Sequence, residues 1–595
     1  MIRTHTLNAH QFDDLAAGHG GAATIRALRS AQVSRRLLLL RGVLDATPDR
    51  LTEPYRLLAA AQRADPAVVT EAVAAPHFGA WVVTASRTTR GAIGDGADPL
   101  DHLAAIAAAA AARAGLDFTI EVAAVDGGVY LPGLGWARTG PGRVVVAGRS
   151  GDIRVGPVAV PANPAIDGPD WQGLRRLRAE RDGLILDVRL DDLDPYRDTH
   201  RLNATGRLSA VEANRWQQIL DPSWHLLVEH HRRYAEAIAA GLLSIVPLTP
   251  PASGNGVNGT SMHAFGSVSL TLPRDDLGFA SSLLHEFQHA KLGALLDLFP
   301  LYTDDAVRRH YAPWRDDPRP LGGLLQGVYA FLGVTDFWRV QRAELSGARA
   351  RFAHFEFARW RERVWRTFQS IERSGRFDAY GRRFLDGMRA TQQSWLADPV
   401  PAELDRLAAE AAEDHWAGWR LRNLRLDPEQ LGRLADAWMG GEPAAPGTLE
   451  QLTVRVAAAD VRALARNVRL DLALQRMAAP ARPAGTCAQP GERDRTDLPG
   501  TPGDHAYARG DFAAAVEAYR EQIAADPDDR GGWLGLTLAC RRCEAPADEP
   551  WHTRPEIPFA LHCAVRAAGG PAPDPIRLGQ WLAGPAMADQ ATEPR

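Results

Sequence analysis

The segment LLHEFQHAKLGALLDL, residues 283–298, determines how the rest of the chain is interpreted. Two histidines at positions i and i+4 of a helix, here His285 and His289, lie about 40° apart and project toward one metal ion. Glu286 lies about 100° around the helix from His285, where a general base or a partner of the metal ligands stands. The segment therefore predicts a metal-binding helix. The alternative is a buried helix whose histidines satisfy local hydrogen bonds.

The spacing alone leaves the metal chemistry and the third ligand open. The extended metzincin pattern requires a glycine and a further histidine where this chain has Leu292 and Leu295, which excludes that class. A zinc peptidase of the gluzincin kind would take a carboxylate from a following helix, and the next glutamate is Glu344. In such an enzyme Glu286 would act as a general base toward water.

The residues around the motif resemble a known family. HEFQHAKLGALLDL and the later stretch YAPWRDDPRPLGGLLQGVYAFLGVTDFWR (311–339) are similar to the HExxH-type, 2-oxoglutarate-dependent peptide β-hydroxylases, HExxH-containing peptide-modification proteins of bacteria. The stretches 12–44, 184–198 and 263–273 are similar as well, so the resemblance covers most of residues 1 to about 475. It implies Fe(II), 2-oxoglutarate and dioxygen, with hydroxylation at the β-carbon of a residue in a ribosomally made precursor peptide. A radical-SAM maturase of the same pathway is a further expected partner.

The resemblance also implies a ligand set. His285 and His289 are the expected first two ligands, and Gln326 stands where members of the family commonly carry histidine. Gln326 is therefore the expected third ligand, although an amide oxygen binds metal less well than imidazole or carboxylate. The alternative for Gln326 is a polar helix residue bonded to a neighbouring backbone group. In an oxygenase, Glu286 would support the ligands rather than activate water.

An oxoacid cosubstrate needs a cation for its distal carboxylate, and the guanidinium fork of arginine binds a carboxylate through two hydrogen bonds. Arg315 and Arg319, in WRDDPRP, are the expected cations. Prolines on both sides of Arg319 restrict its backbone and would position its side chain. The alternative for both arginines is a structural salt bridge to Asp316 or Asp317.

Lys291 is the single lysine of the chain. About 200° of helix rotation separates it from His289, so we expect it to point away from the metal and to lie on the outer face of the helix.

The composition describes an ordinary protein of several domains. The 595 residues are 45% hydrophobic and 24% charged, with a net charge of −4 and no basic tract, so nucleic acid is not an expected partner. The N-terminus lacks the apolar core of a signal peptide, and the apolar runs 37–44 and 105–114 are too short or too weak to span a bilayer. We therefore expect a cytoplasmic protein without a membrane partner. Of its four cysteines, Cys540, Cys543 and Cys563 form, together with His562, a candidate for a structural zinc site.

The predicted fold class is α+β and mainly helical, with a zincin-like HExxH helix core, a small β region and a C-terminal tetratricopeptide-like segment. Residues 1 to about 115 carry helix formers, and residues 118–198 alternate short apolar strands with Gly and Pro turns. Ser209 and Glu212 form a capping box that starts a helix. The stretch 263–272 predicts a strand, either an ordinary internal strand or one that binds an extended peptide by strand addition.

The expected domain boundaries follow from these patterns. Residues 1–200 form an N-terminal helical plus β region, and residues 201–478 the HExxH catalytic region. The Pro/Gly-rich stretch 479–503 is a predicted linker. Residues 504–570 are tetratricopeptide-like, or a plain helical hairpin, and residues 571–595 are an expected loose tail. The repeat-like positions are Ala506, Gly510, Ala515, Tyr519 and Pro527.

Overall fold

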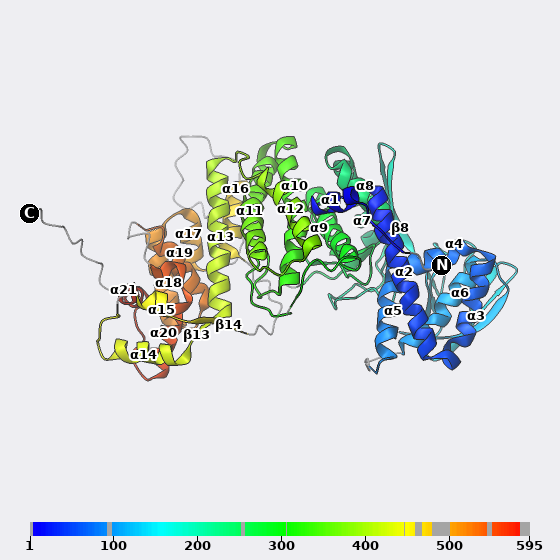
Figure 1. Cartoon of the computed structure of the whole chain (residues 1–595), viewed down its shortest axis with the longest axis horizontal. Helices are drawn as coiled ribbons and strands as arrows, with labels where there is room; N and C mark the ends of the chain where they lie inside the picture. The colour runs from blue at the N-terminus through cyan, green and yellow to red at the C-terminus, as the bar shows by residue number, and fades with distance from the viewer. Residues whose placement is uncertain are drawn as a thin grey trace, which may run out of the picture. The chain divides into compact units, whose positions relative to one another are not determined.

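The computed structural model describes residues 4–91, 98–251, 256–304, 306–445, 447–457, 467–478, 500–543 and 550–583. The chain has the expected mainly helical α+β fold (Figure 1). It divides into two compact units. Unit 1 comprises Met1–Thr303, Tyr329–Phe337 and Arg376–Ser394; unit 2 comprises Asp304–Val328, Trp338–Gly375 and Trp395–Arg595. This division differs from the predicted boundaries at residues 200 and 478, because the N-terminal region and the HExxH helix belong to the same unit.

Unit 1 begins with helices, as the sequence predicts. They are α1 (Ala9–Ala16), α2 (Ala22–Ala46), α3 (Pro48–Ala64), α4 (Pro66–Ala74), α5 (Pro76–Thr88), the 3-10 helix η1 (Pro99–Asp101) and α6 (His102–Arg113). A proline opens each of α3, α4 and α5, where its missing N–H removes no helical hydrogen bond. Small alanines allow α6 to pack on two sides: Leu103 and Ile106 join the helical core, and Ala104 and Ala108 join the core under the strands.

Two small antiparallel sheets follow, which confirms the predicted β region. The first has the order β1-β4-β5-β6 and the second the order β2-β3-β7. Their strands are β1 (Phe118–Ala123), β2 (Gly128–Leu131), β3 (Gly135–Arg138), β4 (Arg143–Arg149), β5 (Asp152–Val155), β6 (Val158–Ala159) and β7 (Trp171–Gly173).

A five-stranded sheet supports the HExxH helix. Its order is β11-β12-β10-β9-β8, with parallel pairing among β9, β10 and β12 and antiparallel pairing at both edges. The strands are β8 (Arg175–Arg181), β9 (Leu184–Leu190), β10 (Ser244–Leu248), β11 (Asn258–Gly259) and β12 (Ser267–Thr271). Strand β12 is the strand predicted within 263–272, and it is internal because β10 and β11 flank it.

Helices α7 (Ala210–His230) and α8 (Arg232–Gly241) connect β9 to β10. The predicted capping box is confirmed, since the Ser209 side chain accepts from the Glu212 backbone and the Glu212 side chain accepts from Ser209. Helix α9 (Asp276–Leu296) follows β12 and carries the HExxH motif; Asp275 caps its N-terminus by accepting from Gly278. Helix α12 (Ala379–Gln393) completes unit 1, and α10 (Leu321–Glu344) includes residues of both units.

Unit 2 is largely helical. Its further elements are α11 (Gly347–Glu372), α13 (Ala402–Asn423), β13 (Leu424–Leu426), α14 (Pro428–Met439), α15 (Thr448–Gln451), β14 (Val454–Val456), α16 (Val468–Ala478), α17 (Pro502–Arg509), α18 (Phe512–Ala525), α19 (Arg530–Cys540), η2 (Pro550–Thr553), α20 (Glu556–Ala567) and α21 (Pro575–Ala583). Strands β13 and β14 pair with each other.

The repeat-like segment forms a helical hairpin. Gly510, at φ +80°, ends α17 in the left-handed conformation, and α18 starts two residues later. Tyr519 is fully buried, and its ring occupies the space that side chains at Gly503 and Gly535 would fill. Most of the predicted linker, residues 479–499, lies outside the described residues. The expectation of a loose tail from residue 571 is wrong for α21, which packs Leu578 and Leu582 into the core.

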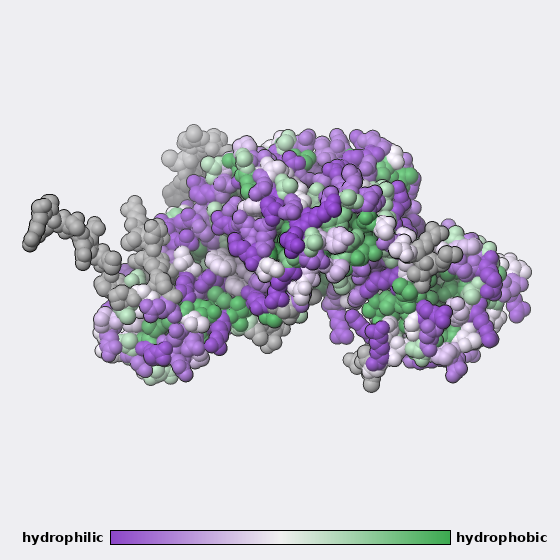
Figure 2. Space-filling model, in the orientation of Figure 1, coloured by the Kyte–Doolittle hydropathy of each residue, from purple (hydrophilic) through white to green (hydrophobic). Residues whose placement is uncertain are grey.

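Hydrophilic residues cover most of the face of the molecule shown in Figure 2, with smaller apolar areas among them. Within the described ranges, no single helix is long and apolar enough to cross a membrane, and α4 with α5 meets that test only as a pair bent by 73°.

Candidate metal centre

Helix α9 directs the two histidines of the motif at one point. The Nε2 atoms of His285 and His289 lie 3.2 Å apart, with their rings at 81° to each other. Nitrogens at this separation subtend an angle of about 100° at an ion about 2.1 Å from each, which is ordinary for a metal bound by imidazoles. Among residues 283–290, these two histidines alone are partly exposed, while the other six are buried. The pair is therefore the partly exposed part of an otherwise buried stretch of helix.

The surroundings hold His285 in the form that binds metal. Burial and the neighbouring His289 lower its pKa well below the usual value of 6.5. A neutral imidazole has a free nitrogen lone pair, whereas an imidazolium has none. The ring of Phe331 packs edge-on against His285 at a centroid distance of 4.9 Å and fixes one side of it.

Glu286 lies beside the histidine pair, as the helix rotation predicts. Its carboxylate is 3% exposed, and one oxygen is 3.9 Å from Nε2 of His285. The hydroxyl of Thr260, which directly follows β11, donates a 2.7 Å hydrogen bond to the other carboxylate oxygen. Burial raises the pKa of Glu286 to about 7, and the Thr260 hydrogen bond opposes that rise. A carboxyl group with this pKa can accept or donate a proton near neutral pH.

The expectation that Lys291 lies on an outer face is wrong. Lys291 is 1% exposed, and its Nζ donates hydrogen bonds to the backbone oxygens of Gly18 and His19. The rings of Tyr234 and Tyr329 lie within 6 Å of it, at 5.7 and 5.8 Å. Burial lowers the pKa of Lys291 to about 7, and Asp14 opposes that shift. The lysine does point away from the histidines, but that side of α9 is covered as well.

Arg315, Arg319 and Gln326 belong to unit 2, whereas the structure brings His285, His289 and Glu286 together in unit 1. Arg315 donates to Asp317 at 2.8 Å and Arg319 to the other oxygen of the same carboxylate at 3.2 Å. The structural salt bridge that was the alternative for these arginines is therefore present. Gln326 is half-buried in the first turns of α10.

The cysteine-based zinc site is not formed. Among the described residues, one group has three ligand atoms from His, Cys, Asp or Glu that are close enough to share a metal. It consists of His77, Asp191 and Asp194. Cys563 instead lies 3.7 Å from a carboxylate oxygen of Asp528.

The sequence did not reveal that His77 group. His77 lies on α5, and the two aspartates lie in the turn after β9, so more than a hundred residues separate them. The motif DDLDP, residues 191–195, was the available signal, but it gives no indication of a histidine partner.

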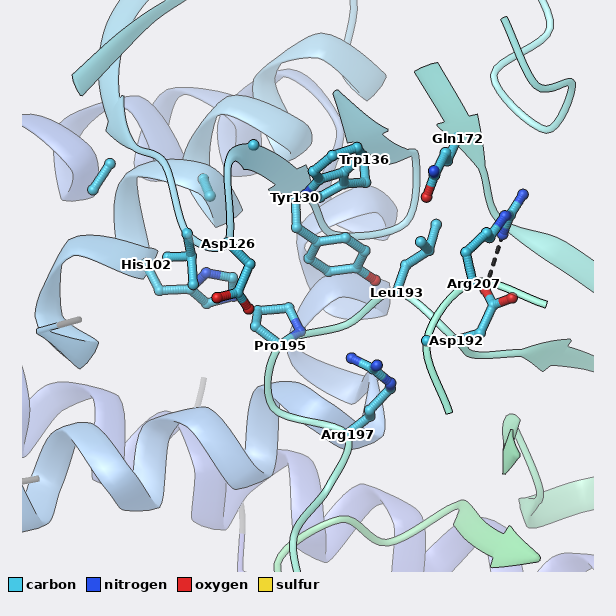
Figure 3. Close-up of a pocket in the computed structure, with 15 residues that line it drawn as sticks. His102, Asp126, Tyr130, Trp136, Gln172, Asp192, Leu193, Pro195, Arg197 and Arg207 are labelled. Carbon is cyan, nitrogen blue, oxygen red and sulfur yellow. Dashed lines mark hydrogen bonds and ion pairs between the residues drawn. The ribbon is translucent and has the colours of Figure 1, made fainter. Parts of the chain in front are cut away.

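A cavity of about 230 Å³ lies next to this group in unit 1. Figure 3 shows the Tyr130 ring projecting into it, with the dashed contact between Arg207 and Asp192 at one side. Leu193 and Pro195, on either side of Asp194, contribute to its wall.

No model of a known protein family matches the chain, and a comparison with curated proteins finds no match either.

Proposed function

We propose that this protein is an Fe(II)- and 2-oxoglutarate-dependent hydroxylase that modifies the β-carbon of a residue in a ribosomally made precursor peptide. The observation that carries the proposal is the convergence of the two Nε2 atoms of His285 and His289 at 3.2 Å. The resemblance of the surrounding sequence selects iron and 2-oxoglutarate from the metals and reactions that such a pair allows. Bound Fe(II) would supply the oxidising chemistry, in which 2-oxoglutarate, dioxygen and a C–H bond give succinate, carbon dioxide and an alcohol.

In this proposal, the chain's own residues hold and orient the reactants. His285 and His289 would bind the metal as neutral imidazoles, and the resemblance remains the ground for Gln326 as a further ligand. Glu286, held by Thr260, orients groups beside the metal. The resemblance is likewise the ground for Arg319 or Arg315 as the cation of the oxoacid, and the structure pairs both with Asp317.

The edge of the sheet offers a place for the peptide. Strand β11 is the last strand of the five-stranded sheet, and Thr260 directly after it contacts Glu286. A peptide that extends the sheet along β11 would therefore run beside the histidine pair, as in zincin-like folds. The candidate for strand addition is thus β11 rather than the internal strand β12.

The test is substrate consumption. Protein loaded with Fe(II) in air should convert 2-oxoglutarate to succinate slowly even without peptide, and faster with a precursor peptide that gains one oxygen atom in mass. His289→Ala should abolish both activities. The proposal fails if the iron-loaded protein makes no succinate while the same preparation hydrolyses peptides with zinc.

A zinc peptidase is the second candidate, favoured by the buried Glu286 carboxylate 3.9 Å from Nε2 of His285. A general base toward water belongs at that position. Glu286→Gln would abolish peptide hydrolysis, whereas it would leave 2-oxoglutarate consumption by a hydroxylase measurable. This substitution therefore separates the two candidates.

The C-terminal hairpin of α17 and α18, with α19, is proposed to be a tetratricopeptide-like unit that binds the precursor peptide or a radical-SAM maturase in the cytoplasm. The support is the buried set Ala506, Ala515 and Tyr519 at the repeat-like positions. Exchanging exposed residues of α18 for residues of opposite charge should weaken co-purification of the maturase without changing metal binding.

A further inference from the structure

Three side chains from distant parts of unit 1 meet in its interior. His77 on α5 is 4% exposed, and Asp191 and Asp194, in the turn after β9, are 2% and 7% exposed. Nδ1 of His77 lies 3.1 Å from Oδ2 of Asp191 and 3.5 Å from Oδ2 of Asp194. All three ligand atoms lie within 4.8 Å of one another.

The other polar atom of each side chain is already held by the protein. Oδ1 of Asp191 accepts the backbone N–H of Asp194 at 3.0 Å, and Oδ1 of Asp194 accepts that of Tyr196 at 2.8 Å. Nε2 of His77 is 3.3 Å from the hydroxyl of Ser267 on β12. Each side chain is thus fixed from outside so that its remaining atom points to a common centre. Metal ligands are typically fixed in this way by a surrounding set of hydrogen bonds.

The charge of the group also favours a bound cation. Two carboxylates with a neutral imidazole carry a charge of −2, and with an imidazolium −1, whereas a divalent cation brings the group to zero. The guanidinium of Arg189, which acts electrostatically on Asp191, is partly exposed and pairs with Glu71. Arg197 bonds the backbone oxygen of Asp194 rather than its carboxylate. In the described part of the chain, the imidazole of His77 is thus the one side chain able to carry positive charge that contacts these two buried carboxylates, and the Tyr130 hydroxyl is a neutral partner of Asp194.

We propose that Nδ1 of His77 and Oδ2 of Asp191 and Asp194 bind one divalent transition-metal ion, at a site separate from the His285–His289 pair. One imidazole and two carboxylates suit Mn²⁺, Fe²⁺ or Zn²⁺ better than Ca²⁺ or Mg²⁺, which select oxygen ligands. The ion would tie α5 to the turn after β9.

The cavity beside the group would give the proposed ion both a route of entry and a further ligand. Leu193 and Pro195, which flank Asp194, line that cavity. Tyr130 projects into it (Figure 3) and interacts through its hydroxyl with the carboxylate of Asp194. The Tyr130 hydroxyl or a water in the cavity would complete the coordination.

The experiment removes the His285–His289 pair and measures how many metal ions bind at the group of His77, Asp191 and Asp194. The full chain with His285→Ala and His289→Ala is stripped with a chelator, and Mn²⁺ or Zn²⁺ is titrated into it by calorimetry. We expect about one bound ion per chain and a rise in the thermal midpoint, because an ion that binds the folded form stabilises it. Adding Asp194→Asn should weaken binding at least about tenfold, while Asp187→Asn, an exposed carboxylate on β9, should leave it unchanged.

The competing outcome is an ion pair without metal, in which His77 stays protonated. Burial lowers the pKa of His77, but the two aspartates raise it further, to about 9. No ion bound by the double-histidine variant, or unchanged binding after Asp194→Asn, overturns the proposal. If Asp194→Asn does not fold, anomalous diffraction from metal-soaked crystals of the double-histidine variant decides. An anomalous peak between His77 and the two aspartates supports the site, and its absence there overturns it.

Discussion

The hydroxyl of Thr260 donates a 2.7 Å hydrogen bond to the carboxylate of Glu286, which joins the edge of the five-stranded sheet to the HExxH helix. Strand β11 is only two residues long, and Thr260 follows it directly. His200 in turn lies 3.0 Å, through Nε2, from the backbone oxygen of Thr260. The position of Glu286 is thus set from outside α9, by residues that the motif itself does not contain.

Thr260→Val should destabilise the protein by about 1 to 3 kcal/mol, because it leaves a buried carboxyl group without a donor. It should also raise the pKa of Glu286 further above 7, since the lost hydrogen bond opposes the effect of burial. Thermal unfolding measures the first effect. The control Thr70→Val removes an exposed hydroxyl that donates to Pro66, and it should change the midpoint little. Equal effects of the two substitutions would contradict the role given to Thr260.

Lys291 should resist amine reagents in the folded protein. It is the only lysine in the chain, and its amino group is buried against the Gly18 and His19 carbonyls. Acetic anhydride should therefore modify the terminal amine of native protein but not Lys291, and denaturant should expose both. Peptide mass mapping distinguishes the two positions. Rapid labelling of Lys291 without denaturant would show that this face of α9 is open.

Lys291 should also make stability depend on pH. Its folded pKa is lowered to about 7 from 10.5, so between these values the unfolded chain binds more protons than the folded one. Stability from this residue therefore increases as the pH rises from about 7 toward 10.5. Lys291→Met should flatten the rise of the thermal midpoint between pH 7 and 9. Parallel curves for both proteins would mean that Lys291 stays protonated when folded.

Gly535→Ala should destabilise unit 2 by about 1 to 3 kcal/mol through overpacking. A Cβ at Gly535 would lie 2.2 Å from the ring of Tyr519, which is itself fully buried. The matched control is Gly432→Ala on exposed α14, where no atom lies within 4 Å of the added Cβ. That control should stabilise the helix by up to about 1 kcal/mol. A neutral result at Gly535 would contradict the close packing of the hairpin.

Local sequence signals predicted the local structure well. The Ser209–Glu212 capping box, the N-terminal helices and the strand before the HExxH helix depend on neighbouring residues, and all are present. The histidine spacing also predicted that both rings face one point, because helix rotation alone determines it.

Features that depend on distant residues could not be predicted in this way. Helix rotation placed Lys291 opposite the histidines, but it could not show that residues 18 and 19 cover that side. The meeting of His77 with Asp191 and Asp194 depends on how α5 packs against the turn after β9. The salt bridges of Arg315 and Arg319 to Asp317 were anticipated only as an alternative, since sequence proximity does not show which partner a charge selects.

The most direct test of the central claim is anaerobic addition of Fe(II) and 2-oxoglutarate to metal-free protein, followed by visible absorption. We predict a metal-to-ligand charge-transfer band that is lost in His289→Ala and retained in Asp194→Asn, because 2-oxoglutarate would bind iron held by His285 and His289. No band in folded wild-type protein that binds zinc tightly through the same histidines would contradict the hydroxylase and favour hydrolysis.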